Sequence, residues 1–82
     1  MTYTAHVTVM PHSELLDPQG KAVLGGLSNL GLNAISDVRI GKHITLQVNA
    51  STEGEAKTIA EEAAARLLAN QVMEQFSVEI VA

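Results

Sequence analysis

Hydrophobic and polar residues alternate in three stretches of the chain, one near each end and one at the centre. An extended chain points successive side chains to opposite faces, so the apolar members of each alternation share one face. These members are Tyr3, Ala5, Val7 and Val9 in the first stretch, Val38, Ile40, Ile44, Leu46 and Val48 in the second, and Phe76, Val78 and Ile80 in the third. The pattern predicts strands that each bury one face.

The central alternation is interrupted at Gly41, and its register limits how the chain passes this residue. A two-residue hairpin would pair Ile40 with His43 and mix core and solvent residues on one face. Two arrangements remain: a three-residue turn over Gly41, Lys42 and His43 that pairs Ile40 with Ile44, or one long strand bent at Gly41. Because strands usually run about 5–6 residues, we favour the turn and expect two strands here.

A first helix is predicted from Pro18, where the alternation gives way to helical spacing. Asp17 can cap its first turn, and proline suits the first helical position because its missing N–H would be unpaired there. Gly31 is expected to end the helix. Gly25 and Gly26 inside it each cost about 1 kcal/mol relative to alanine. That cost indicates either the close approach of another backbone or a frayed helix.

A second helix is predicted after Thr52, whose side chain can cap it. The apolar stripe along this helix is Ala56, Ile59, Ala60, Ala63 and Leu67. Because small alanine side chains dominate the stripe, the helix can lie close to the sheet. Asn70 is expected to end it as a left-handed cap.

The order of these elements, β-α-β-β-α-β, predicts an α+β fold with ferredoxin-like element order in one domain over residues 1–82. We expect a two-layer sandwich, with an antiparallel sheet and both helices on one of its faces. The other face stays uncovered, and a partner sheet can still cover it. Its expected residues include Thr4, His6, Thr8, Arg39, Thr45 and Gln47.

Composition narrows the class of protein. A chain of 82 residues without cysteine has a small core and no disulfide to support it, so self-association is expected. The net charge of −4 leaves no broad cationic surface for nucleic acid. No stretch approaches the ~20 apolar residues of a membrane span, and the N-terminus does not read as a signal peptide. We therefore expect a cytoplasmic protein without a nucleic-acid or membrane partner.

The histidines do not form a recognisable catalytic or metal-binding motif. His6, His12 and His43 fall in different predicted elements, without a paired carboxylate at ligand spacing. His12, Ser13 and Glu14 are adjacent in sequence, and adjacent residues do not normally converge as a catalytic triad does. We therefore predict no catalytic residue and no metal ligand.

Basic residues beside the central glycine are the best binding candidates by local chemistry. Arg39 and Lys42 are two of only five Lys and Arg residues in an acidic chain, and His43 follows them. An exposed turn there can meet an anionic ligand or an acidic partner. A solvated turn that discourages pairing with stray strands explains the same residues equally well.

Three segments resemble the signatures of PurS, the small subunit of phosphoribosylformylglycinamidine synthase. They are LLDPQG at residues 15–20, DVRIGK at 37–42 and LLANQVMEQF at 67–76, called below the first, second and third signature. Each is short, but together they follow the family's order and spacing over nearly the whole chain. Gln75-Phe76 departs from the usual acidic-aromatic ending, and His43 stands where the family often has an aromatic residue.

The resemblance implies a PurS-like domain over residues 1–82 with no active site of its own. Such a subunit is expected to form a homodimer or a dimer of dimers. It bridges a large synthetase subunit to a glutaminase subunit that releases ammonia. No cofactor is expected in this subunit, with ATP and Mg only in the synthetase. The implied partner-binding residues are Arg39, Gly41 and Lys42, to which the local chemistry of the central stretch adds His43. The matching residues at helix ends, Asp17, Pro18, Gly20 and Asn70, have structural roles.

Two other classes of function fit the coarse element order. One is a free-standing regulatory module that binds a small effector at a dimer interface. The other is a small hydrolase like the acylphosphatases, which needs an anion-holding arginine after the first strand. Residues 11–16 contain no arginine, which disfavours the hydrolase.

Overall fold

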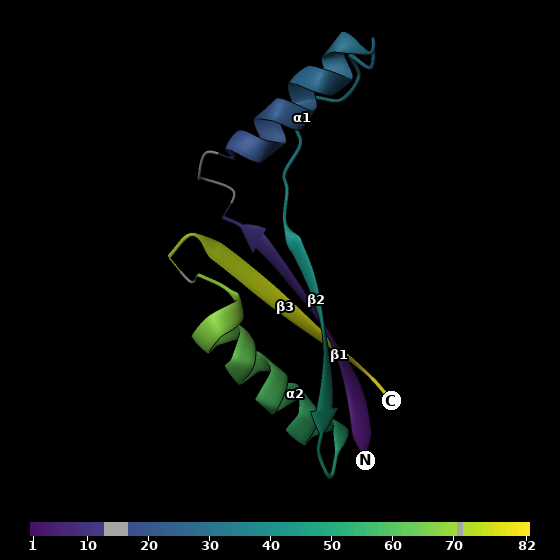
Figure 1. Cartoon of the computed structure of the whole chain (residues 1–82), viewed down its shortest axis with the longest axis vertical. Coiled ribbons are helices and arrows are strands. Elements are labelled where there is room, and N and C mark those ends of the chain that lie inside the picture. The colour runs from purple at the N-terminus through teal and green to yellow at the C-terminus, as the bar shows by residue number, and fades with distance from the viewer. Residues whose placement is uncertain (13–16, 71) are drawn as a thin grey trace.

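The computed structural model describes residues 1–12, 17–70 and 72–82. Figure 1 shows how the elements within these ranges are arranged. They are β1 (Thr2–Pro11), α1 (Pro18–Asn29), β2 (Lys42–Asn49), α2 (Glu53–Ala63), the π-helical segment η1 (Ala64–Leu68) and β3 (Glu74–Val81). The α+β class is confirmed.

The sheet of the described chain has the strand order β2-β1-β3, and both pairs are antiparallel as predicted. On β1 the odd-numbered residues from Tyr3 to Val9 are buried, whereas the even-numbered ones face the uncovered side. The register then places polar residues of all three strands on that side, which we call the open face. Its residues include Thr4, His6, Thr8, His43, Thr45, Gln47, Ser77 and Glu79. The predicted polar face is confirmed for Thr4, His6, Thr8, Thr45 and Gln47, while Arg39 lies outside the strands.

The core lies between the sheet and α2, which covers the opposite face (Figure 1). Ala56, Ala60 and Ala64 are completely buried. They stand four residues apart, so they form one stripe along α2 and η1. Small side chains here bring the helix axis close to β1, where Ala5 and Val7 are also completely buried. The predicted close packing of the second helix is confirmed at Ala56 and Ala60, but Ile59 and Leu67 of the predicted stripe are exposed.

The first helix does not lie on the sheet. Figure 1 shows α1 standing beyond the end of the sheet at which β1 ends and β2 begins, with both chain termini toward the other end. This differs from the expected placement of both helices on one face. Together, α1 and the turns and extended chain of residues 30–40 form what we call the arm. The described chain is accordingly elongated, with principal extents of 51 × 25 × 14 Å.

The expected strand before Gly41 is extended chain without a ladder partner. One of its backbone groups pairs with the residue before α1 instead: the Ile40 N–H donates to the Asp17 carboxylate. The favoured three-residue turn is wrong, because Lys42 already belongs to β2 and pairs with Val9 of β1. The chain runs on through Gly41 without reversing, which is nearer to the alternative of one bent strand. A Cβ at Gly41 would meet the Val9 carbonyl oxygen and the Met10 sulfur. Only glycine therefore lets the chain pass this close to the end of β1.

Within the described ranges, no helix has the length and apolar character needed to cross a membrane.

Candidate functional site

Asp17 joins the first and second signatures. One carboxylate oxygen, Oδ1, accepts from the Gly20 N–H at 3.0 Å, and Oδ2 accepts from the Ile40 N–H at 2.8 Å. The first bond caps α1, and Pro18 occupies the start of the helix, so both predicted roles are confirmed. The second bond anchors the chain that enters β2. Asp17 therefore ties the start of the arm to its end.

The same contacts perturb the ionisation of Asp17. The hydrogen bond from Gly20 is the largest influence and the bond from Ile40 the next, and together they lower the pKa of the carboxyl below its usual value. Both bonds stabilise the charged form, since backbone N–H groups donate to the carboxylate. The lowered pKa thus reflects a structural role.

Gly20 lets the two signatures approach each other. It is the one buried residue of α1. A Cβ built on it would overlap the Val38 carbonyl oxygen and lie 2.8 Å from Oδ2 of Asp17. No larger residue fits without moving one of these groups, so Gly20 has the structural role that the resemblance implies.

The third signature forms the turn between η1 and β3. The Asn70 N–H donates to Glu74 Oε1 at 2.9 Å, and Asn70 Oδ1 accepts from the Val72 N–H at 3.1 Å. No residue of the described chain other than glycine has a positive φ, so the prediction of a left-handed cap at Asn70 is wrong. The helix ends through η1, where the Ala69 N–H returns to the Ala64 carbonyl oxygen. Asn70 is a turn residue.

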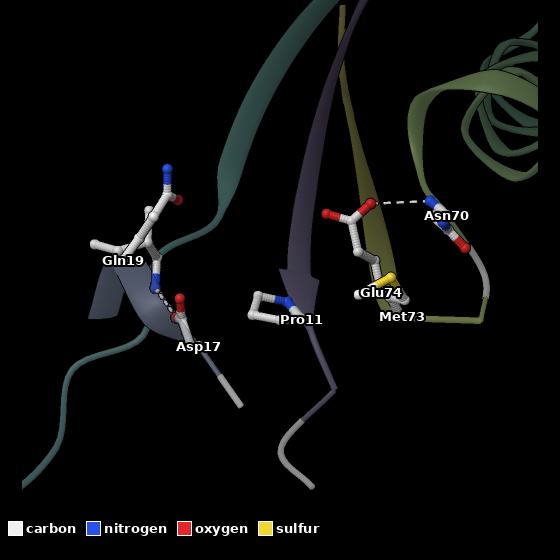
Figure 2. Close-up of a pocket in the computed structure, with 7 residues that line it drawn as sticks. Pro11, Asp17, Gln19, Asn70, Met73 and Glu74 are labelled. Carbon is white, nitrogen blue, oxygen red and sulfur yellow. Dashed lines mark hydrogen bonds between the residues drawn. The ribbon is translucent and has the colours of Figure 1, made fainter. Parts of the chain in front are cut away.

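All three signatures meet around one cavity of about 260 Å³. Figure 2 shows Asp17 and Gln19 on one side of it, Pro11 between, and Asn70, Met73 and Glu74 on the other side. The lining is completed by Ile40 of the second signature. Lys42 connects to the same region, because its Nζ lies 3.6 Å from Glu74 Oε2. Sequence segments far apart in the chain thus build one junction at the base of the arm.

The polar groups of this junction hold the chain together. Its two carboxylates are already engaged: Asp17 accepts two backbone N–H groups, while Glu74 accepts from Asn70 and pairs with Lys42. Among the described residues there is no group of three His, Cys, Asp or Glu placed to hold a metal ion.

The predicted partner-binding residues do not form one cluster. Lys42 faces Glu74, and His43 lies on the open face with its Nε2 3.1 Å from Nδ1 of His6. Arg39 is half-buried, and its Nη2 atom is buried without a hydrogen-bond partner in the described part of the chain. Gly41 lies against the backbone of Val9 at the end of β1. The pairing of His6 with His43 was missed from the sequence, although the register of β1 and β2 could have revealed it.

Comparison with known proteins gives one consistent family. Residues 4–82 match the family described as PurS, phosphoribosylformylglycinamidine (FGAM) synthase. The chain is similar to the FGAM synthase subunit PurS of Synechocystis, with 40% identity over 99% of this chain and 81% of the relative. It is also similar to that of Mycobacterium leprae, with 44% identity over 90% of both.

The fold agrees with this family. In the structure of PurLQS from Thermotoga maritima, one chain superposes with a TM-score of 0.90 at 27% identity, covering 99% of both chains. The three signatures, the junction they form and these similarities over nearly the full length agree: the chain belongs to the PurS family of FGAM synthase.

Proposed function

We propose that this chain is a non-catalytic assembly subunit of FGAM synthase in purine biosynthesis. It bridges an ATP-dependent synthetase subunit and a glutaminase subunit, so that ammonia passes between their sites. Family membership and the likeness to a chain of PurLQS support the proposal. Physically, such a subunit acts by positioning, since holding two sites in register keeps the transferred molecule out of water.

The elongated shape is the observation that carries this proposal. The radius of gyration is 16.1 Å, whereas a compact chain of this length has about 12 Å. The accessible surface is 5590 Å², about 900 Å² more than a compact monomer of this mass exposes. A standard protein interface buries about 800 Å² on each partner. The excess therefore matches one interface per chain.

Part of the exposed apolar surface lies on the arm. Leu30, Leu32 and Ile35 are 76%, 49% and 40% exposed. A helix of 12 residues is marginal in water without packing against something else. We assign the arm surface to a second copy of the chain, in a homodimer or a dimer of dimers.

The oligomer predicts a measurable mass. Light scattering of the purified chain is expected to give at least two chains per particle, and Leu30→Arg is expected to shift the population to monomer because it places a charge in the apolar contact. Leu67→Arg, at an exposed leucine of η1 outside the arm, is the matched control and should leave the mass unchanged. A monomer at all concentrations would contradict the assignment.

The subunit itself is proposed to need no cofactor, with ATP and Mg bound by the synthetase, and to work in the cytoplasm. The junction cavity of one chain, about 260 Å³, is smaller than the ~300–1,000 Å³ of typical ligand pockets. An effector-binding module, the alternative function, would hold its ligand at a dimer interface instead.

Arg39 is the residue of the second signature that we assign to a partner. Its buried Nη2 lacks a hydrogen-bond acceptor in the described chain, and such a group is costly to leave unpaired. A carboxylate of the synthetase subunit would supply the missing acceptor after a small movement of the side chain.

Reconstitution tests the proposal. The isolated chain is expected to show neither glutaminase nor ATPase activity, and glutamine-dependent FGAM formation by the other two subunits should fall sharply when the chain is withheld. Supplying ammonium directly should bypass this loss, because only delivery is impaired. Undiminished glutamine-dependent turnover without the chain would refute the role.

Co-elution with the synthetase tests the assignment of Arg39. Arg39→Glu should weaken co-elution, whereas Lys57→Glu, which makes the same charge change at an exposed residue of α2, should not.

A further inference from the structure

We propose that His6 and His43 form a two-nitrogen binding site for a divalent transition metal, such as Zn²⁺, on the open face of the sheet. The site is separate from the junction of the three signatures and goes beyond the assembly function. Its basis is the close approach of two imidazole nitrogens from neighbouring strands, Nδ1 of His6 and Nε2 of His43, at 3.1 Å.

The sheet itself brings the two rings together. In the antiparallel pairing of β1 with β2, Thr8 lies opposite His43 and His6 lies opposite Thr45. His6 and His43 are therefore diagonal neighbours on one face, a spacing that long side chains bridge. The backbone ladder holds both Cα positions, so the pair is preorganised by the fold.

The spacing of the nitrogens suits a shared metal ion. Imidazole nitrogens bind zinc at about 2.0–2.1 Å, so two ligands at 90–110° around the ion lie about 2.9–3.4 Å apart. The observed separation is 3.1 Å, with the ring centroids 5.2 Å apart and the planes tilted by 54°. Rotation of the side chains can turn both lone pairs toward one point, and His43 is exposed enough to rotate.

Metal binding requires that neither facing ring nitrogen of His6 and His43 carries a proton. Without metal, one facing nitrogen carries a proton that it donates to the other. With metal, both neutral rings carry their protons on the outer nitrogens, Nε2 of His6 and Nδ1 of His43. This is a tautomer change in one ring, and no net proton is released.

The surroundings favour a borderline cation. Glu79 of β3 lies opposite His6, which places a negative charge beside the site on the same face. No third His, Cys, Asp or Glu of the described chain completes the ligand set, so water occupies the remaining positions. Two imidazoles without carboxylate ligands prefer Zn²⁺, Ni²⁺ or Cu²⁺ to the hard ions Mg²⁺ and Ca²⁺.

Titration calorimetry with zinc chloride, on the full chain without a histidine tag, tests the site. One zinc per chain is expected, and His6→Ala and His43→Ala should each weaken binding by about tenfold or more because each removes one of two ligands. His12→Ala is the matched control, because His12 follows β1 and is not part of the pair. It should leave the affinity unchanged, and circular dichroism checks that all variants keep the fold.

Four outcomes would overturn the site, the first three of them seen in the binding data for the chain and its variants. These three are the absence of binding at millimolar zinc, binding that survives in the double variant H6A/H43A, and binding that is lost in H12A. A ratio of one zinc to two chains would also overturn it, since the ligands would then come from two copies. Magnesium chloride in place of zinc should give no heat that depends on either histidine.

Discussion

Replacing Ala60 by leucine is expected to lower the free energy of unfolding by about 3 kcal/mol, the upper end of the usual cost of overpacking. Ala60 is completely buried between α2 and the sheet, together with Tyr3, Ala5 and Val48. The added carbons have no space unless α2 moves away from β1. A domain of this size has a total stability of roughly 4–12 kcal/mol, so the loss is a large fraction of it. Denaturant unfolding at one fixed chain concentration measures the change.

Glu61→Leu is the matched control for this variant, since it adds leucine at the next position of the same helix, where the side chain is exposed. Its effect should stay within about 0.5 kcal/mol. Equal losses in the two variants would mean that helix propensity or solubility, and not the close approach of α2 to the sheet, determines the result. A neutral Ala60→Leu would show that the alanine stripe is not tightly packed.

The local patterns predicted the elements that bury a face against their neighbours. The alternation in β1 encodes burial directly and appears in the structure as expected. The predicted stripe of the second helix is buried at Ala56 and Ala60, whereas Ile59 and Leu67 are exposed. The Asp17 and Pro18 signals were reliable because a helix end needs a local acceptor and tolerates a missing N–H. Such features depend on residues near each other in sequence.

The arm could not be predicted in this way. Val38 and Ile40 alternate like strand residues, and nothing local shows that the Ile40 N–H donates to Asp17, 23 positions earlier. Likewise, Val23, Leu27 and Leu30 recur at helical spacing and form a stripe that a sheet could bury, yet Val23 and Leu30 stay exposed within one chain. A stripe shows that burial is needed but does not identify the surface that provides it. Composition predicts self-association, but no local pattern assigns it to the arm.

The candidate sites were predicted in part. The signatures marked the right segments, but their convergence on one cavity follows from the crossing of the chain at Gly41 and the turn at Asn70. The histidines were dismissed because they fall in different elements, and strand register is what joins His6 to His43. Register is set by tertiary packing, so residues that meet across strands are the hardest to identify from sequence.

Gly20→Ala is expected to separate the start of the arm from its end. The added Cβ would overlap the Val38 carbonyl oxygen and crowd Oδ2 of Asp17, so α1 has to shift and the bond between Ile40 and Asp17 breaks. Forced overlap of this kind costs about 1–3 kcal/mol. Because the arm stands beyond the sheet, the loss should be local. Amide hydrogen exchange at Ile40 should become about tenfold faster or more, while amides of β1 stay protected.

Gly26→Ala is the control that separates this clash from the general effect of alanine in a helix. A Cβ at Gly26 meets nothing within 4 Å, and the residue is exposed in the same helix. Alanine there should stabilise α1 by about 1 kcal/mol and slow exchange in the arm, the opposite sign to Gly20→Ala. If both substitutions slowed exchange, the contact of Gly20 with Val38 would not anchor the arm. If both substitutions made exchange faster, a second copy of the chain or another partner would have to pack closely against Gly26.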